Sequence, residues 1–169
     1  MSGKHRRYFL KARESKELLD KASKRLRIDL EQILKDRINL EVVHTESIEI
    51  FLINGKPALA QTGENIYPTL TFKEFLDIAP RVTVDMGAVP HLCKGANVMA
   101  PGIRRFNGEF QKGDLVLVTD EKYGKPVALG EALYDTEQAK NVKQGIVIRN
   151  IHYVGDKTWN SIKQLAAAI

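Results

Sequence analysis

The stretch Val84–Arg105, VDMGAVPHLCKGANVMAPGIRR, is the most informative part of the sequence. It brings three glycines and three alanines close together, with few bulky side chains between them. Small residues let another backbone approach closely, glycine permits turns that need positive φ, and free backbone N–H groups in such loops bind phosphates or base edges. Lys94 and the pair Arg104–Arg105 add positive charge. A purely structural interpretation stays open, with a helix C-cap at Gly95 and a tight turn at Pro101–Gly102.

Short β-strands are expected to dominate the sequence from Arg81 onward. Apolar runs at 82–84, 115–118, 126–134 and 145–153 are broken by Gly and Pro. Several short strands at close spacing are typical of a small closed barrel, in which no strand edge stays exposed. Short helices are expected at 87–93, 136–141 and 158–168.

The first 80 residues predict a mixed α/β unit that begins with a short strand at 8–10. A helix is expected at 14–27 because apolar residues recur there at helical spacing, namely Leu18, Leu19, Ala22 and Leu26. A second short helix is expected at 30–36. Asp29 with Gln32 three residues later resembles a capping box at its start.

The same unit continues with β-branched, roughly alternating segments at 40–44 and 48–53, followed by 58–60. Asn54–Gly55 predicts a hairpin between the last two, because both residues tolerate positive φ. Thr71 with Glu74 predicts a capping box for a helix through Phe75 and Leu76. We expect this unit to end near Ala79–Pro80.

The net charge of +5 is concentrated at the N-terminus of the 169-residue chain. Residues 1–27 contain ten Lys/Arg against three Asp/Glu, a net +7, which leaves −2 for the remainder. Such a basic arm raises the local concentration of a polyanion and steers its approach. Charge alone leaves open an ordinary solvated helix face. The ten basic residues are Lys4, Arg6, Arg7, Lys11, Arg13, Lys16, Lys21, Lys24, Arg25 and Arg27.

Several classes of protein are not supported by the sequence. No apolar run reaches the roughly 20 residues that span a bilayer, and no apolar segment follows the basic N-terminus as in a secretory signal. The single cysteine, Cys93, fits a reducing cytoplasm and a small core residue better than a nucleophile. The four histidines lack metal-ligand spacing, and no nucleophile elbow is present. We therefore expect a cytoplasmic, non-catalytic protein that has no membrane association and uses no metal or cofactor.

Two halves of the chain carry a family resemblance. The run VDMGAVPHLCKGANVMAPGI resembles the PUA domain of pseudouridine synthases and archaeosine transglycosylases, where Gly-Ala, a later Gly-Ala-Asn and Pro-Gly-Ile recur in this order. GDLVLV, PVALGEA and GIVIRNIHYVGD resemble the rest of that domain. HTESIEIFLINGKPALAQTGENIYPTL is similar to the pre-PUA domain of the malignant-T-cell-amplified family of ribosome-associated proteins, called Tma in fungi. The joint occurrence of both halves makes the resemblance specific.

The resemblance implies an α+β fold, with a small α/β pre-PUA domain over 1–79, a PUA pseudobarrel over 80–155 and a C-terminal helix over 156–169 that packs on the body. It also implies a site for structured RNA over the helix and loop after the first PUA strand, beside the second and last strands. Carried over, that site comprises Gly87, Ala88, Lys94, Gly95, Ala96, Asn97, Val98, Met99, Pro101 and Gly102, to which we add Arg104 and Arg105 for their charge.

Roles within this site follow from the same resemblance. Gly87 and Gly95 would permit close approach, Lys94 would meet a phosphate, and Asn97 would position a loop or read a base. Asp85 is expected in a turn, because the catalytic domain in which pseudouridine synthases use an aspartate is absent here.

The implied function is a translation factor that contacts tRNA or the rRNA of the small ribosomal subunit, beside a partner of the density-regulated-protein type. Two alternatives stay open. One is a PUA accessory subunit of an RNA-modification enzyme, and the other is a protein-interaction adaptor whose PUA surface no longer binds RNA.

Overall fold

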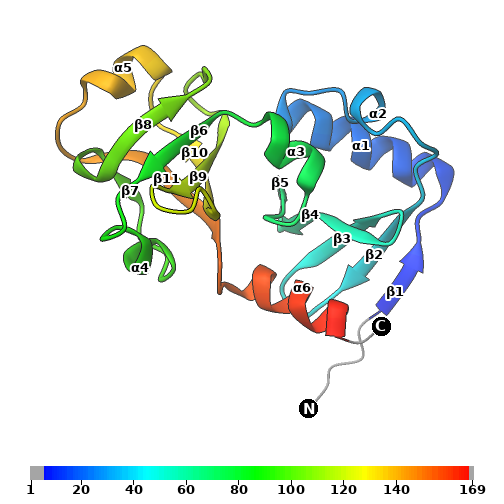
Figure 1. Ribbon diagram of the computed structural model, residues 1–169. Coiled ribbons are helices and arrows are strands. Elements are labelled where there is room, and N and C mark those ends of the chain that lie inside the picture. The colour runs from blue at the N-terminus through cyan, green and yellow to red at the C-terminus, as the bar shows by residue number, and fades with distance from the viewer. Residues whose placement is uncertain (1–5, 168–169) are drawn as a thin grey trace.

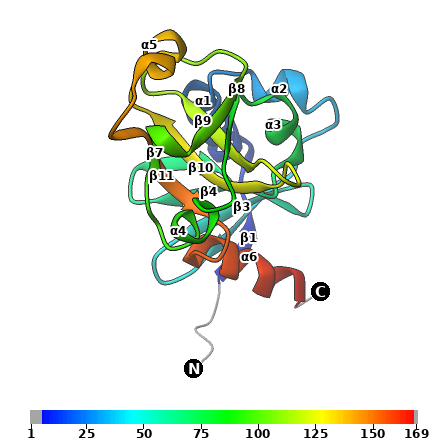
Figure 2. The same ribbon diagram turned by 60° about the vertical axis from the view of Figure 1, so that its left-hand side comes forward.

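The computed structural model describes residues 6–167, in which two curled β-sheets lie side by side (Figure 1). The N-terminal lobe combines the first sheet with α1 (Ala12–Leu26), α2 (Leu30–Ile33) and α3 (Lys73–Ile78). The second lobe combines the other sheet with α4 (Val89–Leu92) and α5 (Thr136–Asn141). The last helix, α6 (Lys157–Ala167), returns from the second lobe to lie below the first sheet in Figure 1 and Figure 2. The predicted α+β class is confirmed.

The first sheet is an antiparallel meander whose strands follow one another in chain order. Its strands are β1 (Arg6–Phe9), β2 (Leu40–His44), β3 (Glu49–Ile53), β4 (Lys56–Thr62) and β5 (Asn65–Pro68). Asn54 and Gly55 adopt φ values of 51° and 83° between β3 and β4, which confirms the predicted hairpin turn. Strand β5 was not expected, because its four residues include a proline and too few apolar positions to alternate.

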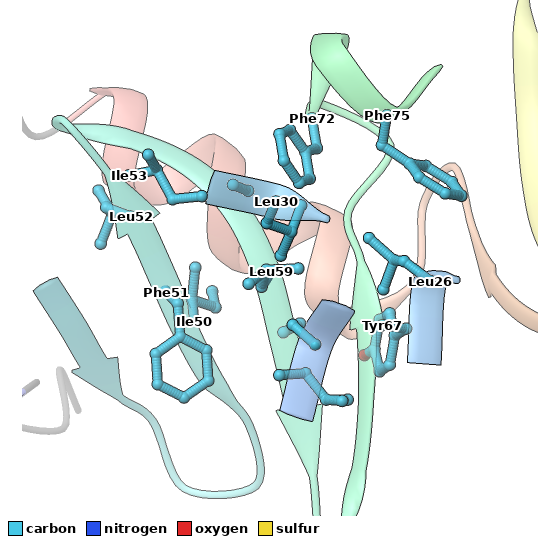
Figure 3. Close-up of a cluster of buried hydrophobic side chains, with 14 of the residues drawn as sticks. Leu26, Leu30, Ile50, Phe51, Leu52, Ile53, Leu59, Tyr67, Phe72 and Phe75 are labelled. Carbon is cyan, nitrogen blue, oxygen red and sulfur yellow. The ribbon is translucent and has the colours of Figure 1, made fainter. Parts of the chain in front are cut away.

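Helix α1 lays its apolar face on this sheet. Leu18, Leu19, Ala22 and Leu26 are all buried, as their helical spacing predicted. Figure 3 shows Leu26 and Leu30 among side chains from the strands and from the segment around α3, including Tyr67, Phe72 and Phe75. The helix ends where Arg27 turns into the left-handed region with φ 57°.

The predicted helix starts had different outcomes. The Asp29 side chain accepts hydrogen bonds from the backbone N–H groups of Glu31 and Gln32, which confirms Asp29 as the N-cap, the first half of the expected capping box. Helix α2 is shorter than the predicted 30–36. The capping box at Thr71 is wrong. Helix α3 begins after Phe72, and the Thr71 hydroxyl donates to Pro57 O at 3.1 Å instead. The Thr71 hydroxyl therefore bonds to β4 and does not cap the start of α3.

The second sheet follows the order β7-β11-β10-β9-β6-β8, and β6 pairs in parallel with β9. Its strands are β6 (Arg81–Val84), β7 (Val98–Met99), β8 (Ile103–Asn107), β9 (Leu115–Asp120), β10 (Pro126–Ala132) and β11 (Ile146–Tyr153). The edge strands β7 and β8 are joined by only Ala100–Gly102, so the sheet has to curl round on itself. The expected barrel is therefore this curled sheet, but it is not closed, because the order of the described strands leaves β7 and β8 as edge strands that do not pair with each other. Neither β7 nor β8 was anticipated, because β7 has only two residues and the sequence of β8, IRRFN, has no strand-like alternation.

The two lobes share a continuous apolar contact. Leu115 and Leu117 of β9 belong to the N-terminal core cluster, whereas Val116 and Val118 belong to the cluster inside the curled sheet. Because side chains alternate along a strand, β9 is buried on both faces, as its unbroken apolar run predicted. Leu129 of β10 joins the N-terminal cluster in the same way.

Polar contacts reinforce this junction. The buried hydroxyls of Tyr67 and Thr158 are 2.7 Å apart. His152, fully buried on β11, accepts the backbone N–H of Leu70 at Nε2 (3.2 Å) and lies 2.7 Å from the Asp156 carboxylate at Nδ1. These bonds connect the end of β11 and the start of α6 to the N-terminal lobe. The final residue of the predicted helix 158–168 lies outside the described part of the chain.

Candidate nucleic-acid interface

The turn after β6 is organised by Asp85. Its Oδ1 accepts the backbone N–H of Ala88 at 2.8 Å, and its backbone carbonyl accepts the same N–H at 3.1 Å. A Cβ at Gly87 would lie 3.1 Å from Asp85 Oδ1, closer than most Cβ contacts, so the turn favours glycine there. The turn role expected for Asp85 is confirmed.

The short helix α4 leads directly into the loop 93–97. Leu92 is buried and anchors the helix, and Gly95 follows with φ +97° and donates its N–H to Leu92 O at 3.0 Å. A side chain at Gly95 would be strained, and its Cβ would lie 3.4 Å from the Tyr153 ring. Helix α4 ends at Leu92 with Cys93 as its C-cap, so the C-cap expected at Gly95 is wrong by two residues. Gly95 forms part of the loop that follows, which exposes Lys94, Gly95 and Ala96 to solvent.

Asn97 and Asn150 hold this loop against β11. Asn97 Oδ1 accepts the backbone N–H of Asn150 at 2.9 Å, so Asn97 positions the loop, one of the two roles expected for it. The Asn150 side chain donates through Nδ2 to Leu92 O at 3.1 Å and to Ala96 O at 2.9 Å. Its Oδ1 is buried without a hydrogen-bond partner among the described residues. Sequence reasoning missed Asn150, although it lies within the GIVIRNIHYVGD segment.

The segment 98–102 also borders the surface around α4. Val98 is buried and serves packing, whereas Met99 is 47% exposed and Pro101 is exposed. The Cβ position of Gly102 lies 3.6 Å from Ala88 Cβ, so this segment packs on the Asp85 turn. The structure thus brings the 85–88 turn, the 93–97 loop and the 98–102 segment together around α4, which lies at the lower end of its lobe in Figure 1.

Arg104 and Arg105 differ in their surroundings. The Arg104 guanidinium lies 3.5 Å from Asp85 and 3.6 Å from Glu121, so its charge is partly neutralised within the protein. Arg105 is exposed opposite Thr83, beside a register shift between β6 and β8. The two arginines therefore do not act as one pair of free charges, in contrast to what adjacency in sequence indicated.

The basic N-terminal segment is largely part of the folded body. Arg7 pairs with Glu41 at 2.7 Å, and Arg25 and Arg27 reach across to Glu131 (2.6 Å) and Asp114 (2.9 Å) of the second lobe. Helix α1 keeps an exposed charged face opposite its apolar one, so the interpretation as a solvated helix face describes it well. Lys4, also counted in the arm, lies outside the described residues.

Burial raises the pKa of the Cys93 thiol, which lowers its reactivity at neutral pH. Between residues 6 and 167, no group of three or more His, Cys, Asp or Glu side chains is placed to hold a metal ion. Over the same range, no helix combines the length and apolar character that crossing a bilayer requires.

The family profile of the PUA domain matches residues 80–154, and that of a domain of unknown function (DUF1947) matches residues 6–73. An uncharacterised protein of Methanocaldococcus jannaschii is 37% identical over 92% of this chain and 96% of its own. Translation machinery-associated protein 20 of Saccharomyces cerevisiae is 28% identical over 78% of this chain and 77% of its own. Malignant T-cell-amplified sequence 1 of Rattus norvegicus is 31% identical over 78% of this chain and 75% of its own.

Among solved structures, a PUA-domain protein of Aeropyrum pernix superimposes with a TM-score of 0.80 at 27% identity, covering 96% of this chain and 93% of that one. The likeness therefore includes both lobes. The chain belongs to the family of translation machinery-associated protein 20 and malignant T-cell-amplified sequence 1, whose resemblance the PUA and pre-PUA motifs indicated.

Proposed function

We propose that this protein binds structured RNA through the surface around α4, as a non-catalytic, translation-associated factor that contacts tRNA or the small ribosomal subunit. The observation that carries the proposal is the 93–97 loop. It exposes Lys94, Gly95 and Ala96, and its backbone is held in place by hydrogen bonds from the Asn150 side chain. Binding to an ordered loop costs little conformational entropy, and small residues beside a cation admit an RNA backbone.

The translation setting rests on family membership. Translation machinery-associated protein 20 of Saccharomyces cerevisiae matches this chain over 78% of its length, a span that reaches into both the PUA and the DUF1947 regions. Contact of the present chain with tRNA or the small subunit is part of the proposal.

The direct test is the affinity for a tRNA with an intact single-stranded acceptor end, measured by fluorescence anisotropy at several salt concentrations. Lys94→Glu and Gly95→Glu are expected to weaken binding strongly. Gly95→Ala adds the same Cβ without the charge and separates backbone strain from repulsion. Lys56→Glu, an exposed charge reversal in the N-terminal lobe, is the matched control. Wild-type binding that neither Lys94→Glu nor Gly95→Glu weakens would remove this surface from the proposal.

Co-sedimentation tests the setting. The protein is expected in the small-subunit fraction at moderate salt, and Lys94→Glu is expected to reduce that fraction. Absence from it, combined with recovery of an RNA-modification enzyme in a pull-down, would favour the accessory-subunit alternative.

The exposed edge strand β1 supports a second function, docking of a partner of the density-regulated-protein type. In the described sheet β1 pairs only with β2, and it presents Tyr8 at 40% and Phe9 at 66% exposure. Open strand edges pair readily with another chain, and aromatic side chains are enriched at interfaces. Phe9→Glu is expected to abolish capture of the purified partner and to leave RNA affinity unchanged. Unchanged capture would place the partner elsewhere.

A further inference from the structure

The tip of the β9–β10 hairpin, residues 121–125, presents an aromatic side chain between cations. Tyr123 is 64% exposed. The Lys122 and Lys125 ammonium groups lie 5.1 Å and 5.7 Å from its ring centroid. Single exposed aromatic residues are common on protein surfaces, so exposure by itself carries no argument. What distinguishes this tip is that its ring is flanked by charge, held on an ordered turn and placed beside the α4 surface.

The order of the turn comes from Asp120, which precedes it. The two carboxylate oxygens of Asp120 accept the backbone N–H groups of Tyr123 and Lys125, and its carbonyl accepts the N–H of Gly124 at 3.0 Å. The hydrogen bond from Tyr123 N–H, with support from the neighbouring amides, lowers the pKa of Asp120. Gly124 supplies the left-handed backbone, with φ +66°, that closes the turn. The ring is thus presented on a preorganised backbone.

The location of the tip connects it to the proposed RNA surface. The Glu121 N–H donates to Val84 O at 3.0 Å, at the point where β6 enters the Asp85 turn. Arg104 bridges the Glu121 and Asp85 carboxylates. The negative charge of Glu121 is therefore partly neutralised by Arg104 within the protein. Within residues 6–167, neither Lys122 nor Lys125 forms an ion pair, so their charges are available to a ligand.

We propose that Tyr123 stacks on an unpaired base of the bound RNA while Lys122 and Lys125 contact the flanking phosphates. The proposal rests on the proposed function and extends its footprint from α4 to the hairpin tip. Cation–π contacts at exposed sites are weak, so the lysines can exchange the ring for phosphate groups. An aromatic platform between cations suits an unpaired nucleotide. A protein interface is less well matched, because lysine is depleted at interface cores.

The test compares two RNA probes with the full-length protein, a hairpin with a single-stranded 3′ extension and the same hairpin with a blunt end. Tyr123→Ala is expected to weaken binding of the extended RNA about 5- to 150-fold, the range of a lost base–aromatic stack, and to leave the blunt RNA nearly unaffected. Tyr123→Phe keeps the ring and is the matched control, expected to bind as wild type. Replacing both lysines with Gln is expected to reduce the slope of log K against log salt by about 0.7 per lysine.

The stacking contact, the phosphate contacts and the proposed function can each be refuted by a different result. If Tyr123→Ala binds both RNAs as wild type does, or weakens both equally, the stacking proposal is wrong while RNA binding around α4 stands. An unchanged salt slope in the double lysine variant removes the phosphate contacts. Wild-type protein that binds neither probe would overturn this proposal together with the proposed function. Unchanged thermal unfolding of each variant confirms that the fold is intact.

Discussion

Replacing Asn150 with Asp is expected to make the 93–97 loop open more easily. The substitution keeps the size of the side chain and turns the donor Nδ2 into an acceptor that faces two carbonyl oxygens, Leu92 O at 3.1 Å and Ala96 O at 2.9 Å. A neutral hydrogen bond contributes about 1 kcal/mol net, so losing two makes opening easier by about 2 kcal/mol, or about 30-fold, before repulsion is added. Exchange of the Gly95 and Ala96 amide hydrogens should accelerate by at least that factor.

Asn150→Ala is the informative comparison. It removes the donor and also the Oδ1 that is buried without a partner, whose burial costs about 1–3 kcal/mol, so its loop should open less readily than that of the Asp variant. Amide exchange followed by NMR measures both variants, with the β9 amides as an internal reference for global unfolding. RNA affinity should fall in the same order. Unchanged exchange at Gly95 and Ala96 in the Asp variant, or an Ala variant that opens more readily, would refute the positioning role of Asn150.

Three further predictions concern the body of the protein. Tyr67→Phe removes a buried hydroxyl bond to Thr158 and should lower the unfolding free energy by about 1–3 kcal/mol in urea titrations, and no change would show that the bond is dispensable. Gly130→Ala would place a Cβ against Ile148 Cγ2 and 2.7 Å from Arg149 O, so the melting temperature should fall sharply, whereas Gly63→Ala, with no neighbour within 4 Å, should cost only the strain of its φ of +59°. Asp120 has a lowered pKa because backbone N–H groups bind its carboxylate, so its contribution is complete above its unfolded-state pKa and is lost as pH falls through the lower folded value. Urea midpoints measured against acid pH should therefore fall more steeply for wild type than for Asp120→Asn, and parallel curves would contradict the role of the carboxylate.

Local chemistry allowed much of the fold to be predicted from sequence. Asn54–Gly55 specified its turn because both residues tolerate positive φ, and the structure has them at 51° and 83°. The apolar spacing in α1 predicted which residues are buried, and the continuous apolar run of β9 predicted a strand covered on both faces. The family motifs added the overall α+β architecture, because they occur together in both halves.

The sequence by itself therefore determined most of the helices and longer strands and the family, since these depend on neighbours a few residues apart, whereas the short strands β5, β7 and β8 carried no such local pattern. Tertiary structure alone decided which side chains are free to act. Asn150 lies 53 residues from Asn97, and no local pattern indicates that it orders the 93–97 loop. Arg104 and Arg105 look equivalent in sequence, but only Arg104 meets Asp85 and Glu121. Thr71 likewise exchanges the predicted cap for Pro57 O. Hydrogen bonds and ion pairs form between groups brought together by folding, and their partners are therefore set by the three-dimensional arrangement of the strands.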